Sequence, residues 1–398
     1  MNPYLDDLLP YPFERLDALK KGTTPAVTTP HVALSIGEPK HASPQFVLDV
    51  LTDHATATNG LLTYPPTRGS EALRQAIADW LRLRFGVSAN PSTQILPVNG
   101  TREALFSFGQ AMLSGQPGTI VQTPNPFYQI YEGAAKLRGA TPYYVPCLPE
   151  TNDLPDFEGI SESVWQATEL IYLCSPGNPT GAVLDEATLQ QLIERAQRYD
   201  FVIAADECYS EVYHDEQSPP PSLLQAAARM GLDGFDRCMV FHSLSKRSNL
   251  PGLRSGFVAG DAKLMAPYYD YRTYHGCAMP VHVQEASIAA WQDERHVIAN
   301  RAIYREKFDR VYPILSNVLN VAMPPAAFYL WPQLPIDDEA FALRLFAEEN
   351  ITVLPGSYLA REHNGVNAGA GRARIALVAP LDDCVSAAQR IAEFVTRL

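Results

Sequence analysis

Short apolar runs recur through the middle of the chain, and stretches with helical spacing separate several of them. The runs cover residues 95–98, 119–122, 142–145, 170–174, 201–205, 239–242 and 256–259. The clearest helical patterns between them cover residues 102–113, 129–137 and 185–199. Continuous apolar strands that alternate with helices are typical of a mostly parallel sheet covered on both faces. The pattern therefore predicts a large α/β domain built on a seven-stranded, mostly parallel sheet.

The pattern changes after about residue 280. A long helical region covers roughly 282–316, and after it come an aromatic segment at 327–331, a helix near 338–349, strands at 351–354 and 374–378 and a last helix at 382–397. We therefore predict a large domain at 41–280 and a smaller α+β domain at 281–398. Residues 1–40, which are rich in Pro and Thr, predict an N-terminal arm that joins the small domain.

Composition and charge narrow the classes of partner. The chain has 398 residues, is 46% hydrophobic and carries a net charge of −13 without any basic run, which argues against nucleic acid or an anionic membrane as the main partner. The six cysteines and nine histidines show no metal-ligand spacing, so we expect reduced thiols and no metal. Acids stand where a signal peptide would carry lysines, and no apolar stretch reaches membrane-spanning length. These features predict a cytoplasmic protein.

Candidate chemistry centres on the segment 243–256, between two apolar runs. Its Lys246 lies in a hydroxyl-rich loop, and a lysine held there is a candidate for a lowered pKa and for imine formation with a carbonyl. Ser243, Ser245 and Arg254 around it suit a phosphate dianion. An aldehyde and a phosphate on one ligand suggest pyridoxal phosphate (PLP). The alternative is a solvated loop with an ordinary lysine.

A second phosphate-binding candidate follows the first apolar run. The segment 99–102 opens a helix, and a helix start loosened by Gly100 presents backbone N–H groups to an anion. Gly100, Thr101 and Arg102 are therefore candidates for cofactor binding. A plain N-cap by Thr101 is the alternative.

Three further residues suit the pyridine ring. Asp206 ends a buried run, and a buried acid is costly unless a cation, such as a protonated pyridine nitrogen, pairs with it. Asn178, in a turn fixed by prolines and glycines, and Tyr209 can hydrogen-bond the phenolic oxygen of PLP.

Two candidates have strong structural alternatives. Tyr128, in a proline-rich turn, can stack on the ring, although core packing is the commoner fate of such an aromatic residue. Arg374 at the mouth of a strand can clamp a substrate carboxylate, or it can form a surface ion pair.

The order and spacing of these motifs resemble the fold-type I PLP enzymes, specifically the class I/II aminotransferases, over nearly the full length. The motifs are Tyr64 to Gly69, 99–101, Ser175 to Gly181, 206–209, 243–246 with Arg254, and Arg374. The resemblance implies that Lys246 forms the imine with PLP and moves the substrate proton, and that Arg374 binds the α-carboxylate. It also implies that Gly37 lies near the substrate, and that Tyr64 reaches the phosphate of the neighbouring subunit in a homodimer with shared sites.

Within that family, segments 35–41, 125–133, 246–249 and 271–276 resemble the N-succinyldiaminopimelate aminotransferases of lysine biosynthesis. The reaction implied is N-succinyl-LL-2,6-diaminopimelate plus 2-oxoglutarate giving N-succinyl-2-amino-6-oxopimelate plus glutamate. No arginine matches the one that aspartate-specific members use for the side-chain carboxylate. Arg272, or Arg15 in the arm, is a candidate for the distal carboxylates, with structural ion pairing as the alternative for each.

Several other functions stay open at this point. One is a class I/II aminotransferase with an aspartate, aromatic or acetylornithine-type donor, and another is a PLP C–S β-lyase, which would release pyruvate and ammonia. A PLP-fold transcriptional sensor would need a DNA-binding segment, and no basic helix-turn-helix precedes the domain. A nucleotide-binding protein would need a G-x-G-x-x-G helix start, which does not follow the first strand.

Overall fold

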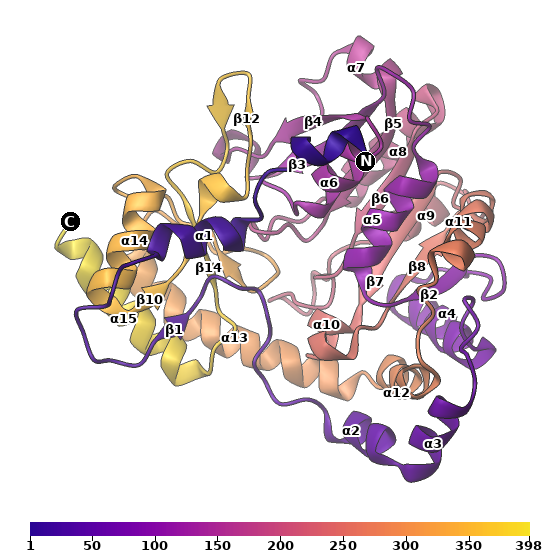
Figure 1. Ribbon diagram of the computed structural model, residues 1–398, viewed down its shortest axis with the longest axis horizontal. Coiled ribbons are helices and arrows are strands. Elements are labelled where there is room, and N and C mark those ends of the chain that lie inside the picture. The colour runs from indigo at the N-terminus through magenta and orange to yellow at the C-terminus, as the bar shows by residue number, and fades with distance from the viewer.

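A seven-stranded sheet forms the centre of the computed structural model, which describes residues 1–398 (Figure 1). Its strands are β2 (Ile95–Val98), β3 (Ile120–Asn125), β4 (Thr141–Pro146), β5 (Thr168–Cys174), β6 (Val202–Asp206), β7 (Cys238–Ser243) and β8 (Gly256–Gly260). They lie in the order β2-β8-β7-β6-β5-β3-β4. Only β8 runs antiparallel to its neighbours. The predicted mostly parallel sheet is confirmed.

Helices cover both faces of this sheet, which explains why its strands are apolar without interruption. The helices are α4 (Glu71–Phe85), α5 (Thr101–Met112), α6 (Ile130–Lys136), α7 (Glu162–Ala167), α8 (Glu186–Tyr199), α9 (Leu223–Arg229), α11 (Ala262–His275) and α12 (Val281–Gln292). Along β6, Ile203 and Ala205 face the core beneath α4, α8, α9 and α12, whereas Val202 and Ala204 face the core beneath α5, α6 and α11. Successive side chains of a strand point to opposite faces, so both sets are buried.

A smaller body packs beside the large one around a second core. It contains the antiparallel strands β9 (Tyr329–Leu330), β14 (Ala373–Ala376) and β11 (Leu354–Pro355), the strand β10 (Ile351–Thr352) and the helices α13 (Arg295–Ser316), α14 (Asp338–Glu349) and α15 (Leu381–Thr396). Phe341, Leu345, Ile391 and Phe394 fill the centre of this core. No helix of the chain is both long and apolar enough to cross a membrane.

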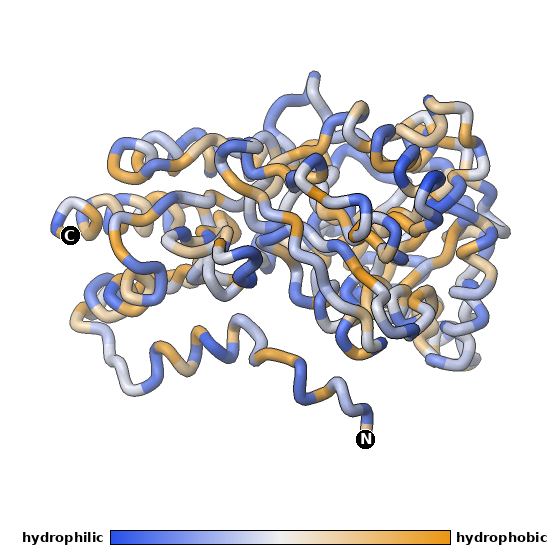
Figure 2. Tube along the Cα trace, turned by 90° about the horizontal axis from the view of Figure 1, so that it is seen from above, coloured by the Kyte–Doolittle hydropathy of each residue, from blue (hydrophilic) through white to orange (hydrophobic).

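The N-terminal arm touches both bodies. Its strand β1 (Val32–Ala33) pairs in parallel with β10, and α1 (Pro12–Lys20) packs Leu16 against Trp331 of the small body. Its first turn, η1 (Pro3–Asp7), lies instead on the large body, where Lys136 Nζ donates to the carbonyl of Asp7 at 3.0 Å. Figure 2 shows this arm running along the side of the molecule.

The change from one core to the other comes later in the chain than predicted. The sequence placed the boundary at 281, but the apolar face of α12 packs on α4, and Ala286, Ala290 and Trp291 belong to the large core. The small core begins within α13, at Phe308. The boundary at 281 is therefore wrong, because a change in helical pattern does not reveal which core a helix face contacts. Two short helices that also pack on α12, α2 (Gln45–Thr52) and α3 (His54–Leu62), belong to the large body.

Candidate active site

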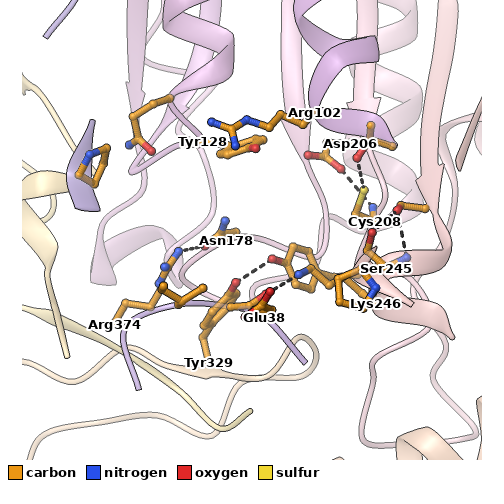
Figure 3. Close-up of a pocket in the computed structure, with 18 of the residues that line it drawn as sticks. Glu38, Arg102, Tyr128, Asn178, Asp206, Cys208, Ser245, Lys246, Tyr329 and Arg374 are labelled. Carbon is orange, nitrogen blue, oxygen red and sulfur yellow. Dashed lines mark hydrogen bonds between the residues drawn. The ribbon is translucent and has the colours of Figure 1, made fainter. Parts of the chain in front are cut away.

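A cavity of about 620 Å³ opens between the two bodies at the carboxyl ends of the parallel strands (Figure 3). Ligands bind at this edge in open α/β sheets. Most of the predicted site residues line it: Gly37, Thr101, Arg102, Tyr128, Asn178, Asp206, Tyr209, Ser243, Ser245, Lys246, Arg254 and Arg374. The structure therefore brings together residues that lie up to several hundred positions apart in the sequence.

Lys246 projects into the cavity from the short helix α10 (Leu244–Arg247), which directly follows β7. The Ser243 side chain starts this turn by accepting from the backbone N–H of Ser245 at 3.1 Å. Lys246 Nζ donates to the carbonyl of Gly37 and has no carboxylate partner. Burial lowers the pKa of Lys246 to about 8, and the positive charge of Arg374 acts in the same direction. An amine with this pKa is suited to attack an aldehyde at neutral pH.

Asp206 ends the central strand β6 and is only 5% exposed. Its carboxylate accepts from the hydroxyl of Tyr131 at 2.8 Å and from the backbone N–H of Cys208 at 3.2 Å. Burial raises the pKa of Asp206, and the hydrogen bonds from Cys208 and Tyr131 oppose that shift. No lysine or arginine pairs with this carboxylate, so a cationic ring nitrogen would supply the partner that a buried charge requires.

The opposite end of the cavity has the donors that a phosphate dianion needs. The hydroxyls of Ser243 and Ser245 lie 2.9 Å apart, and α5 begins at Thr101 with its free backbone N–H groups. Arg254 bonds only to backbone carbonyls, those of Pro251 and Asn99. Gly100 itself does not line the cavity, but a Cβ there would come within 2.3 Å of Arg254 Nη2. Only glycine therefore lets this guanidinium approach the helix start.

Arg374 and Asn178 form the part of the cavity nearest the small body. Arg374 is 4% exposed, and it donates to Asn178 Oδ1 at 3.0 Å and to the carbonyl of Ser35 at 2.6 Å. The alternative of a surface ion pair does not hold, because no carboxylate contacts this arginine. A buried guanidinium that faces a cavity without an acid is suited to bind a ligand carboxylate.

Tyr209 and Tyr128 line two other parts of the wall. The hydroxyl of Tyr209 lies 2.7 Å from that of Tyr329 in the small body. Tyr128 is half-buried, and burial raises the pKa of its hydroxyl above the ordinary value. In Figure 3 the guanidinium of Arg102 lies beside the Tyr128 ring. The stacking of Tyr128 on a cofactor ring remains a prediction.

Besides Gly100, three predicted residues do not line the cavity. Tyr64 is 99% exposed, and its contact with a neighbouring subunit remains a prediction. Arg272 is fully buried, and it bonds to Glu103 at 2.5 Å and to the carbonyl of Cys277 at 2.7 Å. Arg15 also lies outside, paired with Glu339. For both arginines the structure favours the alternative of structural ion pairing, so neither is placed to bind a distal carboxylate in this chain.

Sequence reasoning missed Tyr131, which lies behind Asp206, and three residues of the cavity wall, Tyr329, Glu38 and Phe13. Tyr131 follows Tyr128 by one helical turn, so a hydroxyl directed at Asp206 could have been suspected once α6 was placed beside β6. Tyr329 lies in the aromatic segment 327–331, but its partner Tyr209 is far away in the sequence. Glu38 and Phe13 also line the cavity. No local signal distinguishes them, because their place at the cavity depends on contacts between the arm and segments far away in the sequence, such as the pairing of β1 with β10.

These residues fit PLP at both of its charged ends. Asp206 is a buried carboxylate without a cation, and Ser243, Ser245 and Arg254 form a polar cradle without an anion. Lys246 lies between them as a buried amine with a lowered pKa. The donor set therefore matches a ligand that has a cationic ring nitrogen, an aldehyde and a phosphate.

Comparison with known proteins agrees with this geometry. Residues 29–391 match the family described as Aminotransferase class I and II. An LL-diaminopimelate aminotransferase of Nitratidesulfovibrio vulgaris strain DP4 is 32% identical over 89% of this chain and 90% of its own length. An aminotransferase structure from Neisseria meningitidis is 48% identical, with a TM-score of 0.94 over 99% of this chain and 100% of its own. A probable N-succinyldiaminopimelate aminotransferase from Thermus thermophilus is 28% identical, with a TM-score of 0.84 over 96% and 99% of the two chains.

The bond from Tyr131 to Asp206 yields a first prediction. In Tyr131→Phe the carboxylate loses a donor, so its pKa rises further and it pairs less well with a ring cation. We expect the dissociation constant for PLP to rise about 5–10-fold, the worth of one such hydrogen bond. Equilibrium titration of the apoprotein measures it. Tyr268→Phe is the matched control, since Tyr268 is equally buried but bonds to Ser107. Equal constants in the two variants would contradict the assignment.

The lowered pKa of Lys246 yields a second prediction. Only the neutral amine attacks an aldehyde, and with a pKa of about 8 about a tenth of it is neutral at pH 7, against less than ~0.1% for an ordinary lysine. We expect the rate of imine formation between apoprotein and PLP to rise with pH and to level off above a midpoint near 8. Stopped-flow absorbance measures this rate, and Lys246→Ala, which forms no imine, is the control. A midpoint near 10 would contradict the burial of this amine.

Proposed function

The chain belongs to the class I and II aminotransferases, which are PLP-dependent, and we propose that its amino donor is N-succinyl-LL-2,6-diaminopimelate and its acceptor 2-oxoglutarate. The products are N-succinyl-2-amino-6-oxopimelate and glutamate, formed in two half-reactions on the route to diaminopimelate and lysine. The observation that carries the proposal is a pair of cavity arginines, Arg374 and Arg102, that bond to no carboxylate. Two separate guanidiniums suit a donor with carboxylates at both ends.

The proposed catalytic roles follow from the geometry. When bound, PLP supplies an electron sink for the bond to the substrate Cα. Asp206 holds the ring nitrogen in its cationic form, and Asn178 and Tyr209 donate to the ring oxygen. Lys246 Nζ would take the proton from the donor Cα in the first half-reaction and return a proton to the acceptor Cα in the second. Lys246 also holds the cofactor between turnovers.

The proposed substrate contacts lie at two ends of the cavity. Arg374 binds the α-carboxylate, next to Asn178 and the backbone at Gly37. Arg102 lies across the cavity, where its guanidinium stands 5.2 Å from the Tyr11 ring and has no acidic partner. We assign to it the distal carboxylates of the donor, in addition to the cofactor contact expected from its place beside Thr101.

A second candidate donor is free LL-diaminopimelate. The relative from Nitratidesulfovibrio vulgaris is named for that substrate, whereas the succinylated compound appears in the name of the Thermus protein. The free donor carries a distal ammonium, and Glu38 on the cavity wall is the acid that would face it. Glu38 is already paired with Lys40, however. The succinylated donor has no distal ammonium and needs no such acid.

We also propose that the active form is a homodimer with shared sites. Tyr64 is fully exposed on one protomer, beside the exposed apolar side chains of Leu61 and Leu62. Exposed apolar residues gathered in one segment are typical of a contact surface. In this proposal Tyr64 completes the phosphate site of the partner.

Each half-reaction can be tested by itself, which gives the third prediction. Purified holoprotein is mixed with one amino donor and no acceptor, and its visible Schiff-base band is followed. We expect N-succinyl-LL-2,6-diaminopimelate to bleach the band, and 2-oxoglutarate to restore it with release of glutamate. Bleaching by free LL-diaminopimelate alone would favour the second candidate. Bleaching by aspartate or aromatic donors alone would contradict the assignment to diaminopimelate and lysine biosynthesis. Release of pyruvate and ammonia would indicate a β-lyase.

The fourth prediction is that replacing Arg374 lowers kcat/KM for every donor, whereas replacing Arg102 lowers it mainly for the donor with a distal carboxylate. Arg374→Met removes the partner of the α-carboxylate, so kcat/KM should fall about 100-fold or more for every donor. Arg102→Met should lower kcat/KM about 10-fold or more for the diaminopimelate donor, while alanine, which has no distal carboxylate, is the control substrate and should change little. Steady-state kinetics with both donors measures this. Equal losses for alanine and the long donor would show that Arg102 serves the cofactor alone.

A further inference from the structure

Three polar side chains form a continuous hydrogen-bonded chain behind the lysine loop. Lys307 Nζ lies 2.7 Å from His41 Nε2, and His41 Nδ1 lies 3.1 Å from Asn300 Oδ1. Asn300 Nδ2 then donates to the backbone carbonyl of Lys246 at 3.1 Å, and to that of Arg247 at 3.4 Å. The chain therefore ends on the backbone of the residue that carries the reactive amine.

Donor and acceptor chemistry gives this chain one direction. An ammonium group has only protons to donate, so His41 Nε2 accepts from Lys307 and the imidazole proton resides on Nδ1. That proton is donated to Asn300 Oδ1, which fixes the amide orientation and leaves its NH₂ group facing the carbonyl of Lys246. Each link thus determines the orientation of the next.

The first link is unusual because it is a buried cation without an acid. Lys307 is 1% exposed, and its only other hydrogen bond is to the carbonyl of Leu377 at 3.1 Å. Burial lowers the pKa of Lys307 to about 8, and burial together with the charge of Lys307 lowers the pKa of His41. The other titratable groups near Lys307 are Tyr304 and Cys384, and neither is a carboxylate. A cation kept under these conditions is costly to stability, so stability does not explain it.

The histidine segment holds the lysine loop at a second point. Asn249 Nδ2 donates to the carbonyl of His41, and also to that of Ala42 at 3.1 Å. Asn249 has a left-handed backbone with φ of +54°. The turn from 246 to 249 is therefore held from both sides by groups that come from outside it.

Aromatic packing holds the histidine ring itself. The Tyr304 ring lies 4.7 Å from the ring of His41 and stacks on Phe328 at 5.2 Å. The ring of Phe328 in turn lies 5.5 Å from Lys246 Nζ. The hydrogen-bonded chain and the reactive amine therefore contact one aromatic layer.

We propose that Lys307, His41 and Asn300 are positioning residues that hold the backbone of Lys246 and so set the direction of its amine. None of the three lines the cavity, so they act only through Lys246. The inference rests on the proposed role of Lys246 as the residue that binds PLP. Asn300 and Lys307 both lie on α13, whose far half belongs to the small core. Through α13, the backbone of Lys246 is thereby fixed relative to the small body, which carries Arg374.

Two apolar replacements break the chain at different links, which gives the fifth prediction. Lys307→Met keeps the side-chain length, and His41→Phe keeps the ring against Tyr304. The pH midpoint of the visible Schiff-base band should shift by about 0.5–1 unit in each variant, the equivalent of one hydrogen bond. The double variant should shift no further than the larger single change, because both break one chain. We expect kcat to fall about 5–10-fold, with KM within about two-fold.

His214→Phe is the matched control. His214 is a half-buried histidine whose ring packs on Phe308 of α13 at 4.3 Å and whose ring nitrogens are buried without a hydrogen-bond partner. It should leave both the midpoint and kcat unchanged. Asn300→Leu, which has a similar shape and no polar group, repeats the test at the last link if either other variant fails to fold.

The outcomes separate the inference from the function on which it rests. If the band is present and its midpoint is the same in the wild type and all three chain variants, the positioning role is overturned and the residues are structural. Additive shifts in the double variant would overturn the single chain. If the wild-type protein shows no band with PLP, the proposed role of Lys246 is contradicted, and with it the function on which the positioning inference rests.

Discussion

The buried carboxylate of Asp206 is the constraint on which the site depends. It stands at the end of the central strand β6, with hydrogen bonds but no cation. A charge in that position is unfavourable without a cationic partner, and in the proposed function the ring nitrogen of PLP is that partner. The neighbouring strands β5 and β7 lead directly to Asn178 and Lys246. The sheet order therefore places Asp206, Asn178 and Lys246, the three groups proposed to contact the cofactor ring, on one wall of the cavity.

The substrate half of the site depends on the second body and on the arm. Arg374 and Tyr329 come from the small sheet, and Gly37 comes from the arm that follows β1. Gly37 must be glycine, because a Cβ there would lie 1.9 Å from the Tyr329 hydroxyl. The proposed cofactor contacts thus come from the ends of one sheet, whereas the proposed substrate contacts come largely from the small body and the arm. The chain of Lys307, His41 and Asn300 joins these two halves behind the reactive amine.

The sequence predicts the strands of the large sheet and most of the candidate site residues. The contacts of α12 and Arg272 were not predicted, and for one shared reason. All seven strands follow from apolar runs, and the polar residue after each run identifies Asp206 and Lys246, because strand ends gather at one edge of a parallel sheet. Contacts made on a helix face were not readable. The face of α12 turned out to contact α4, and Arg272 turned out to pair with Glu103. A sequence shows that a helix has an apolar or charged face, but not which core or which acid that face meets.

Charge balance in the cavity argues that distal recognition depends on Arg102. In the proposed function Arg254 and Asp206 pair with the two charged ends of PLP and Arg374 pairs with the α-carboxylate, which leaves Arg102 and Glu38 for the remainder of a donor. The Glu38 side chain is half exposed and already paired with Lys40, so water and that lysine satisfy it whether or not an ammonium arrives. Arg102 has no such acid. In this proposal a distal carboxylate therefore binds more favourably, through Arg102, than a distal ammonium binds through Glu38. Acylation of the distal amine removes the ammonium, for which the cavity offers only Glu38.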